Sequence, residues 1–225
     1  MLFRSLFLHK PITAVQRDKI SASRPMDDLE YEVDSPSEEC FAVANRCTDN
    51  IVHLMAFPQN AARYIDHVAL LGKPAVKRNE WCRAYHKVMR KCSYINKEKR
   101  LLVKSPDNTC HIREILKIYP NAKFIHICRN PYKVIQSTVN MFEMGSSFLS
   151  LQNIPSHEET AENAVCLYKK LYGRYFKDRD IIPKGNLIEI KYEDFIKTPV
   201  EHAKRIYETL CLPGFNDVLP KFEEY

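Results

Sequence analysis

One arrangement of residues occurs twice in this chain and constrains its fold more than any other feature. An apolar run is followed by a basic residue, by Ser-Pro or Asn-Pro, and then by apolar residues at helical spacing. Residues 101–103 precede Lys104 in the first copy, and residues 122–128 precede Arg129 in the second. Each proline suits the first position of a helix, because it lacks an N–H group. Each copy therefore predicts a strand followed by a helix, an alternation that is typical of α/β folds with parallel strands.

The remaining apolar spacing extends this alternation along the chain. It predicts a third strand over residues 186–191 and helices over residues 35–46, 81–93, 157–179 and 200–211. Ser35 and Glu38 match a capping box, with Pro36 at the first helical position. We therefore expect one α/β domain over residues 1–225, with a parallel sheet flanked by helices and the weakest assignment over residues 1–23.

Several classes of protein are excluded by composition. The chain has five glycines, and no two of them have the spacing of a dinucleotide-binding or NTP-binding loop. Hydrophobic residues make up 45% and charged residues 28%, which excludes a wholly disordered chain. No uncharged apolar stretch approaches 18 residues, so no membrane span is expected. Arg4 interrupts the apolar N-terminus and no cleavage site follows, which argues against a signal peptide.

The eight cysteines are dispersed and form no C-x-x-C pair, which disfavours a zinc ribbon or a redox motif. Cys128 lies in an apolar run and is expected to be a buried free thiol. We therefore expect reduced cysteines and a cytoplasmic protein, with the Golgi lumen as the alternative if a membrane anchor precedes this sequence.

Charge is unevenly distributed along the chain. Residues 73–104 carry eleven Lys and Arg against Glu80 and Glu98, whereas residues 26–60 are acidic. The basic segment has two interpretations, which the sequence leaves open. It forms either a binding surface for a polyanion or nucleic acid, or the solvated face of a helix.

Three polar residues directly follow predicted strands, namely Lys104, Arg129 and Tyr192. Ligands of open α/β sheets bind at the carboxyl ends of the strands. Arg129 also precedes a predicted helix N-terminus, and Ser137 lies two turns along that helix. A guanidinium group and a nearby hydroxyl suit a phosphate monoester. His126 alternates with isoleucines and is expected to face the other side of its strand, in a structural role.

Together these segments resemble the PAPS-dependent sulfotransferases, from about residue 24 to the C-terminus. The resemblance is carried by Lys104-Ser105-Pro106, by residues 124–132 (FIHICRNPY), by Ser137-Thr138 and by residues 191–195 (KYEDF). It implies a sulfotransferase architecture related to the P-loop NTPases. It also implies transfer of a sulfonate group from PAPS (3′-phosphoadenosine 5′-phosphosulfate) to an acceptor hydroxyl or amine, without a metal.

The resemblance assigns roles to individual residues. Arg129 and Ser137 would bind the 3′-phosphate of PAPS, Tyr192 would lie near the adenine, and Lys104 would lie near the transferred sulfonate. Some relatives carry a histidine base close to this lysine. Here Asp107 and His111 are the weak candidates for the base. The acceptor is a small molecule, a glycan or a protein, and no nucleic-acid partner is implied.

The family's phosphosulfate loop, P-x-S-G-[ST]-[ST], has no counterpart in this sequence. We therefore expect a sulfotransferase that is truncated at its N-terminus. Each charge-assisted hydrogen bond contributes about 1.5–3 kcal/mol, so losing several would weaken PAPS binding by roughly three decades. An inactive or poorly folded chain is the expectation, which turnover of PAPS by the purified protein would refute.

Overall fold

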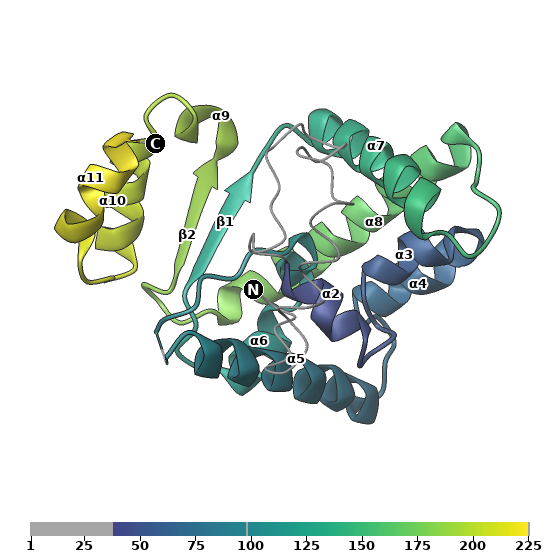
Figure 1. Ribbon diagram of the computed structural model, residues 1–225, viewed down its shortest axis with the longest axis horizontal. Helices are drawn as coiled ribbons and strands as arrows, with labels where there is room; N and C mark the ends of the chain where they lie inside the picture. The colour runs from purple at the N-terminus through teal and green to yellow at the C-terminus, as the bar shows by residue number, and fades with distance from the viewer. Residues whose placement is uncertain (1–37, 98, 225) are drawn as a thin grey trace, which may run out of the picture.

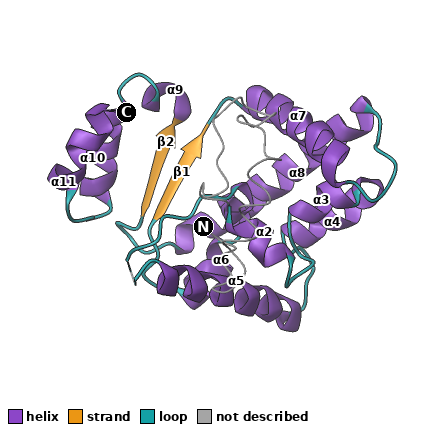
Figure 2. Ribbon diagram, viewed as in Figure 1, coloured by secondary structure: helices purple, strands orange, loops and turns teal. Residues whose placement is uncertain are grey.

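A computed structural model describes residues 38–97 and 99–224 of the protein (Figure 1). Helices surround one pair of parallel strands (Figure 2). The helices are α2 (Glu39–Ala44), α3 (Val52–Ala56), α4 (Ala61–Val68), α5 (Ala75–Ile95), α6 (Ile112–Ile118), α7 (Pro131–Leu149), α8 (His157–Asp178), α9 (Tyr192–Phe195), α10 (Pro199–Thr209) and α11 (Phe215–Glu224). Short 3₁₀ turns lie at η1 (Pro58–Asn60), η2 (Pro106–Cys110) and η3 (Arg179–Ile181). The strands are β1 (Phe124–Cys128) and β2 (Leu187–Lys191).

The two strands pair in parallel, with Phe124 opposite Leu187 and Cys128 opposite Lys191. This pairing confirms the predicted parallel sheet flanked by helices. Both strands begin within two residues of their predicted starts. Because residues of a strand alternate between its two faces, one face of the sheet is apolar and the other is mixed.

Helices cover both faces of the sheet (Figure 1). On one face, Ile188 and Ile190 are buried against Leu210, at the end of α10. On the other face, the His126 ring stacks on Tyr175 of α8, with centroids 4.0 Å apart. His126 is thus a packing residue, on the side of β1 that the alternation predicted.

The predicted strand over residues 101–103 is wrong. Leu101 and Val103 are half-buried while Leu102 is 88% exposed, which is the alternation of extended backbone. Within the described residues this segment has no ladder partner, and the strands there are β1 and β2. A strand needs a neighbour for its backbone N–H and C=O groups, and an apolar run does not supply one.

The two Pro-initiated helices differ in their starts. The Asn130 side chain accepts hydrogen bonds from the N–H groups of Tyr132 (3.0 Å) and Lys133 (3.4 Å) and so caps α7, which begins at Pro131 as predicted. Ser105 caps no helix, because its hydroxyl donates to Asp107 instead (2.5 Å). The segment after it forms the turn η2 before α6 begins.

The first helix of the described residues, α2, lies within the range predicted over residues 35–46. Within the described residues, α2 begins at Glu39, and its cap residue Glu38 makes no side-chain capping bond. Ser35 and Pro36 lie outside the described residues.

A capping box that we did not predict starts α8. There the Ser156 hydroxyl accepts from the Glu159 N–H, and the Glu159 carboxylate accepts from the Ser156 N–H.

Candidate functional site

The carboxyl ends of β1 and β2 bring two of the predicted site residues together. Arg129 directly follows β1, and Tyr192 directly follows β2. Since Cys128 lies opposite Lys191 in the register, both residues emerge at the same edge of the sheet. The Arg129 guanidinium carbon lies 4.5 Å from the centroid of the Tyr192 ring. This is cation–π geometry, which holds the guanidinium in place without using its hydrogen-bond donors.

The turn that carries Arg129 is fixed by polar contacts. The Asn130 N–H donates to the carboxylate of Glu193 (3.0 Å), which ties the start of α7 to the start of α9. This N–H lowers the pKa of Glu193, and the charges of Arg129 and Lys133 lower it further. The turn therefore presents one anchored carboxylate beside two cations, Arg129 and Lys133.

Ser137 is exposed on α7, two turns after the helix start. Lys133 lies one turn before it, so both side chains project from the same face of the helix. Among the described residues no hydrogen bond engages the Ser137 hydroxyl. Lys133 was missed in the sequence, although its four-residue spacing from Ser137 is a usable signal.

Lys104 lies at the end of the unpaired segment, and among the described residues no hydrogen bond or ion pair joins it to Arg129 or Tyr192. Its side chain is 78% exposed, and its ammonium group forms an ion pair with Glu38, the cap residue of α2. This ion pair links positions 66 residues apart. Local patterns in the sequence do not reveal contacts of that kind.

His111 and Asp107 are both buried. The His111 ring has no exposed surface, its Nε2 lies 2.7 Å from the carbonyl oxygen of Val68, and its centroid lies 4.2 Å from that of Trp81. Burial lowers the pKa of His111, so the ring is neutral and its Nε2–H donates to that carbonyl. Asp107 is 3% exposed and accepts from Ser105. Their burial argues against either residue as the base for an incoming acceptor.

A further carboxyl group near this segment was not singled out in the sequence. Glu39 is 4% exposed, and its Oε1 accepts from the Asn108 amide (2.5 Å). Burial raises the pKa of Glu39 to about 7. The sequence gives no local signal for it, because the burial depends on packing between segments that lie 69 residues apart.

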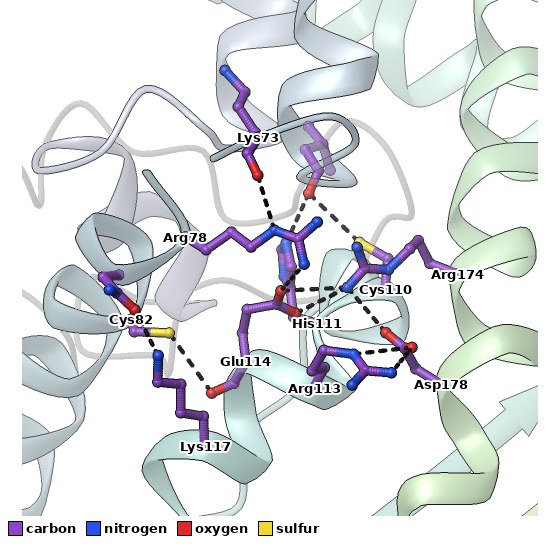
Figure 3. Close-up of polar contacts among 12 residues, drawn as sticks. Lys73, Arg78, Cys82, Cys110, His111, Arg113, Glu114, Lys117, Arg174 and Asp178 are labelled. Carbon is purple, nitrogen blue, oxygen red and sulfur yellow. Dashed lines mark hydrogen bonds and ion pairs between the residues drawn. The ribbon is translucent and has the colours of Figure 1, made fainter. Parts of the chain in front are cut away.

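Behind His111, a buried cluster of charges joins α6 to α8 (Figure 3). The Arg174 guanidinium lies 3.2 Å from Glu114 and 3.0 Å from Asp178, and Arg113 donates to Asp178 at 2.8 Å. Both carboxylates are almost fully buried and both are paired. We interpret the cluster as structural, because removing one member would leave an uncompensated buried charge.

Two further findings bear on the kind of site. Within residues 38–97 and 99–224, no three His, Cys, Asp or Glu side chains gather in a metal-binding arrangement. In the same part of the chain, every helix is too short or too polar to cross a bilayer.

Comparison with known proteins gives the chain a family. The family model described as the sulfotransferase family matches residues 10–217. Two curated relatives, from Mycobacterium bovis and Mycobacterium tuberculosis, are both named omega-hydroxy-beta-dihydromenaquinone-9 sulfotransferase Stf3. Each is 27% identical over 206 residues, which is 92% of this chain and 53% of the relative.

This chain thus spans about half the length of the curated relatives it matches. No solved structure matches it significantly. The family match nevertheless covers nearly the whole sequence, including both strands and the residues that follow them. The chain belongs to the sulfotransferase family.

Proposed function

We propose that the protein takes part in sulfonate transfer from PAPS to an acceptor hydroxyl or amine. In this proposal, the edge formed by Arg129 and Tyr192 holds the 3′-phosphoadenosine end of the donor. Arg129 and Ser137 bind the 3′-phosphate, and Tyr192 lies against the adenine. No metal takes part.

One observation carries the proposal: Arg129 and Tyr192 come from different strands, 63 positions apart, and meet at the carboxyl edge of the sheet. The cation–π contact leaves the planar set of guanidinium donors free for a phosphate. The aromatic ring beside it offers a surface on which a nucleotide base can stack. Lys133 adds a second positive charge at the same place and offsets the carboxylate of Glu193.

The transfer follows from this placement of charge. The acceptor oxygen or nitrogen attacks the sulfur in line, and the bond between sulfur and the bridging phosphate oxygen breaks. The acceptor passes its proton to solvent water, and 3′,5′-ADP (PAP) leaves with the electron pair. Lys104 would stabilise the sulfonate oxygens, which requires it to leave its ion pair with Glu38. Because His111 and Asp107 are buried, the proposal assigns the base to neither.

A hydroxyl is the favoured acceptor, because the names of both mycobacterial relatives give a hydroxylated compound as theirs. We place the protein in a reducing compartment such as the cytoplasm. In support of this, all eight cysteines are free, and burial raises the pKa of several of them, for example Cys47.

Calorimetric titration of PAP into the purified chain tests the proposal. We expect micromolar binding, and binding weaker by about tenfold or more for Arg129→Ala, because a charge-assisted contact contributes about 1.5–3 kcal/mol. Arg205→Ala is the matched control, since Arg205 is exposed on α10 and belongs to no site described above. Absence of binding by a chain that circular dichroism shows to be folded would refute the proposal. Equal affinities for the chain and Arg129→Ala would refute it as well.

A further inference from the structure

The basic segment noted in the sequence borders a hollow on the protein surface. Arg83 and Lys87 project from α5, and Arg46 approaches from the end of α2. The hollow has a volume of about 380 Å³, within the range of about 300–1,000 Å³ that is usual for small-molecule sites. Its remaining lining is formed by Cys47, Thr48, Asp49, Glu80 and Ala84.

The charges around this hollow are not balanced. Asp49 pairs with Lys73 (3.1 Å) and Glu80 pairs with Lys77 (2.7 Å), and neither of these lysines lines the hollow. Both lining carboxylates are therefore already neutralised. By contrast, Arg46, Arg83 and Lys87 are exposed, and no carboxylate of residues 38–97 and 99–222 forms an ion pair with them. These three cations give the hollow a net positive potential, which favours an anionic ligand.

The lining also restricts the class of anion. Among the described residues it contains no aromatic ring, and such rings are where proteins stack the bases of single-stranded nucleic acids. Of the described lining residues, only Ala84 and Cys47 are apolar, and both are buried, so a lipid gains little there. The carboxylate of Glu80 and the hydroxyl of Thr48, which are accessible, can instead accept hydrogen bonds from hydroxyl groups.

We propose that this hollow binds an anionic saccharide. Arg83 and Lys87 lie one helical turn apart and face the same way, so they can bind acidic substituents of one chain of sugars. The Glu80 carboxylate and the Thr48 hydroxyl receive the sugar hydroxyls. In Figure 1, α5 lies along the lower edge of the molecule, and β1 and β2 end toward the upper edge. The saccharide site is thus separate from the proposed nucleotide site and does not depend on it.

Two double variants of α5 test the site, with a sulfated heparin-derived tetrasaccharide as the probe. R83A/K87A removes the two cations of α5 that line the hollow. R90A/K91A is the matched control, because it removes the same charge from exposed positions of the same helix outside the hollow. A linear polyphosphate of matched charge reports on binding to any polyanion. All four residues are exposed, so both variants are expected to fold, which circular dichroism checks.

We expect R83A/K87A to weaken tetrasaccharide binding by about tenfold or more, and R90A/K91A to change it less than about threefold. We also expect the tetrasaccharide to bind more tightly than the polyphosphate. Equal losses in the two variants would reveal diffuse attraction along the helix and would overturn the site. Polyphosphate binding as tight as the tetrasaccharide would overturn the saccharide assignment, and absence of binding would overturn both.

Discussion

The segment that leads into α6 and the segment that leads into α7 start alike, with an apolar run, a basic residue and a proline. They differ in what their apolar runs contact. Residues 124–128 pair with β2 and form a strand, whereas residues 101–103 lie extended beside the core without a partner in the described part of the chain. The helices differ too, because α7 has 19 residues and a side-chain cap, while α6 has 7 residues and none.

This difference shows that the two segments are stabilised by different kinds of interaction. β1 is stabilised by a hydrogen-bonded neighbour and by apolar packing around β2. The segment that ends in α6 depends on a buried ion cluster with α8 and on Glu39, whose carboxyl accepts from Asn108 in η2. Changes to strand packing should therefore act on one segment, and changes to buried charge on the other.

The largest effect is expected at the strands. Ile190 is 2% exposed, and Ile190→Asp buries a charge without a partner. We expect the free energy of unfolding to fall by a value on the order of 5 kcal/mol, enough to unfold most of the protein at room temperature. The same change at Leu102, which is 88% exposed, should cost less than about 0.5 kcal/mol. Urea unfolding checks both, and a comparable loss at Leu102 would mean that residues 101–103 are packed as a strand.

The next largest loss of stability is expected when the buried ion cluster of α6 and α8 is disrupted. Arg174→Met removes the buried cation that pairs with Glu114 and Asp178. We expect the free energy of unfolding, measured in urea, to fall by about 3–5 kcal/mol. Arg179→Met is the control, because Arg179 is 38% exposed and pairs with surface carboxylates. Its loss should stay below about 1 kcal/mol. If Arg174→Met lowers the free energy of unfolding no more than this control does, the cluster does not stabilise the packing of α6.

A smaller effect depends on pH. Burial raises the pKa of Glu39 from 4.5 to about 7, so the folded protein keeps a proton that the unfolded chain has released. Stability from this group is present below about pH 4.5 and is lost as the pH rises toward 7. The loss is on the order of 3 kcal/mol, at about 1.4 kcal/mol for each pH unit crossed. Glu39→Gln should flatten this slope, and an unchanged slope in that variant would contradict the assignment.

Local signals predicted the parts of the fold that need few distant contacts. Alternating apolar residues located β1 and β2, and Asn130-Pro131 located the start of α7. The apolar run at residues 101–103 also predicted a strand, but these residues form none. A strand needs a hydrogen-bonded neighbour, which no local pattern encodes. Short helices such as α3 and α9 were missed for a related reason, since tertiary packing outweighs their weak propensity.

In the candidate site, too, some residues could be placed from local patterns and others depend on distant contacts. Arg129 and Tyr192 could be brought together from the sequence, because parallel strands place their carboxyl ends at one edge. The positions of Lys104 and His111 could not be foreseen. The ion pair of Lys104 with Glu38, and the burial of His111 between Val68 and Trp81, join segments that lie far apart in the chain.

The central claim is that Arg129 recognises a 3′-phosphate at the edge where Tyr192 lies. The most direct test is the ratio of affinities for PAP and for adenosine 5′-phosphate, which lacks that phosphate, in the chain and in Arg129→Ala. We predict that the chain prefers PAP by about tenfold or more and that Arg129→Ala loses this preference while keeping the weak affinity for adenosine 5′-phosphate. A preference for PAP that survives in Arg129→Ala would contradict the claim, as would the absence of any preference in the unmodified chain.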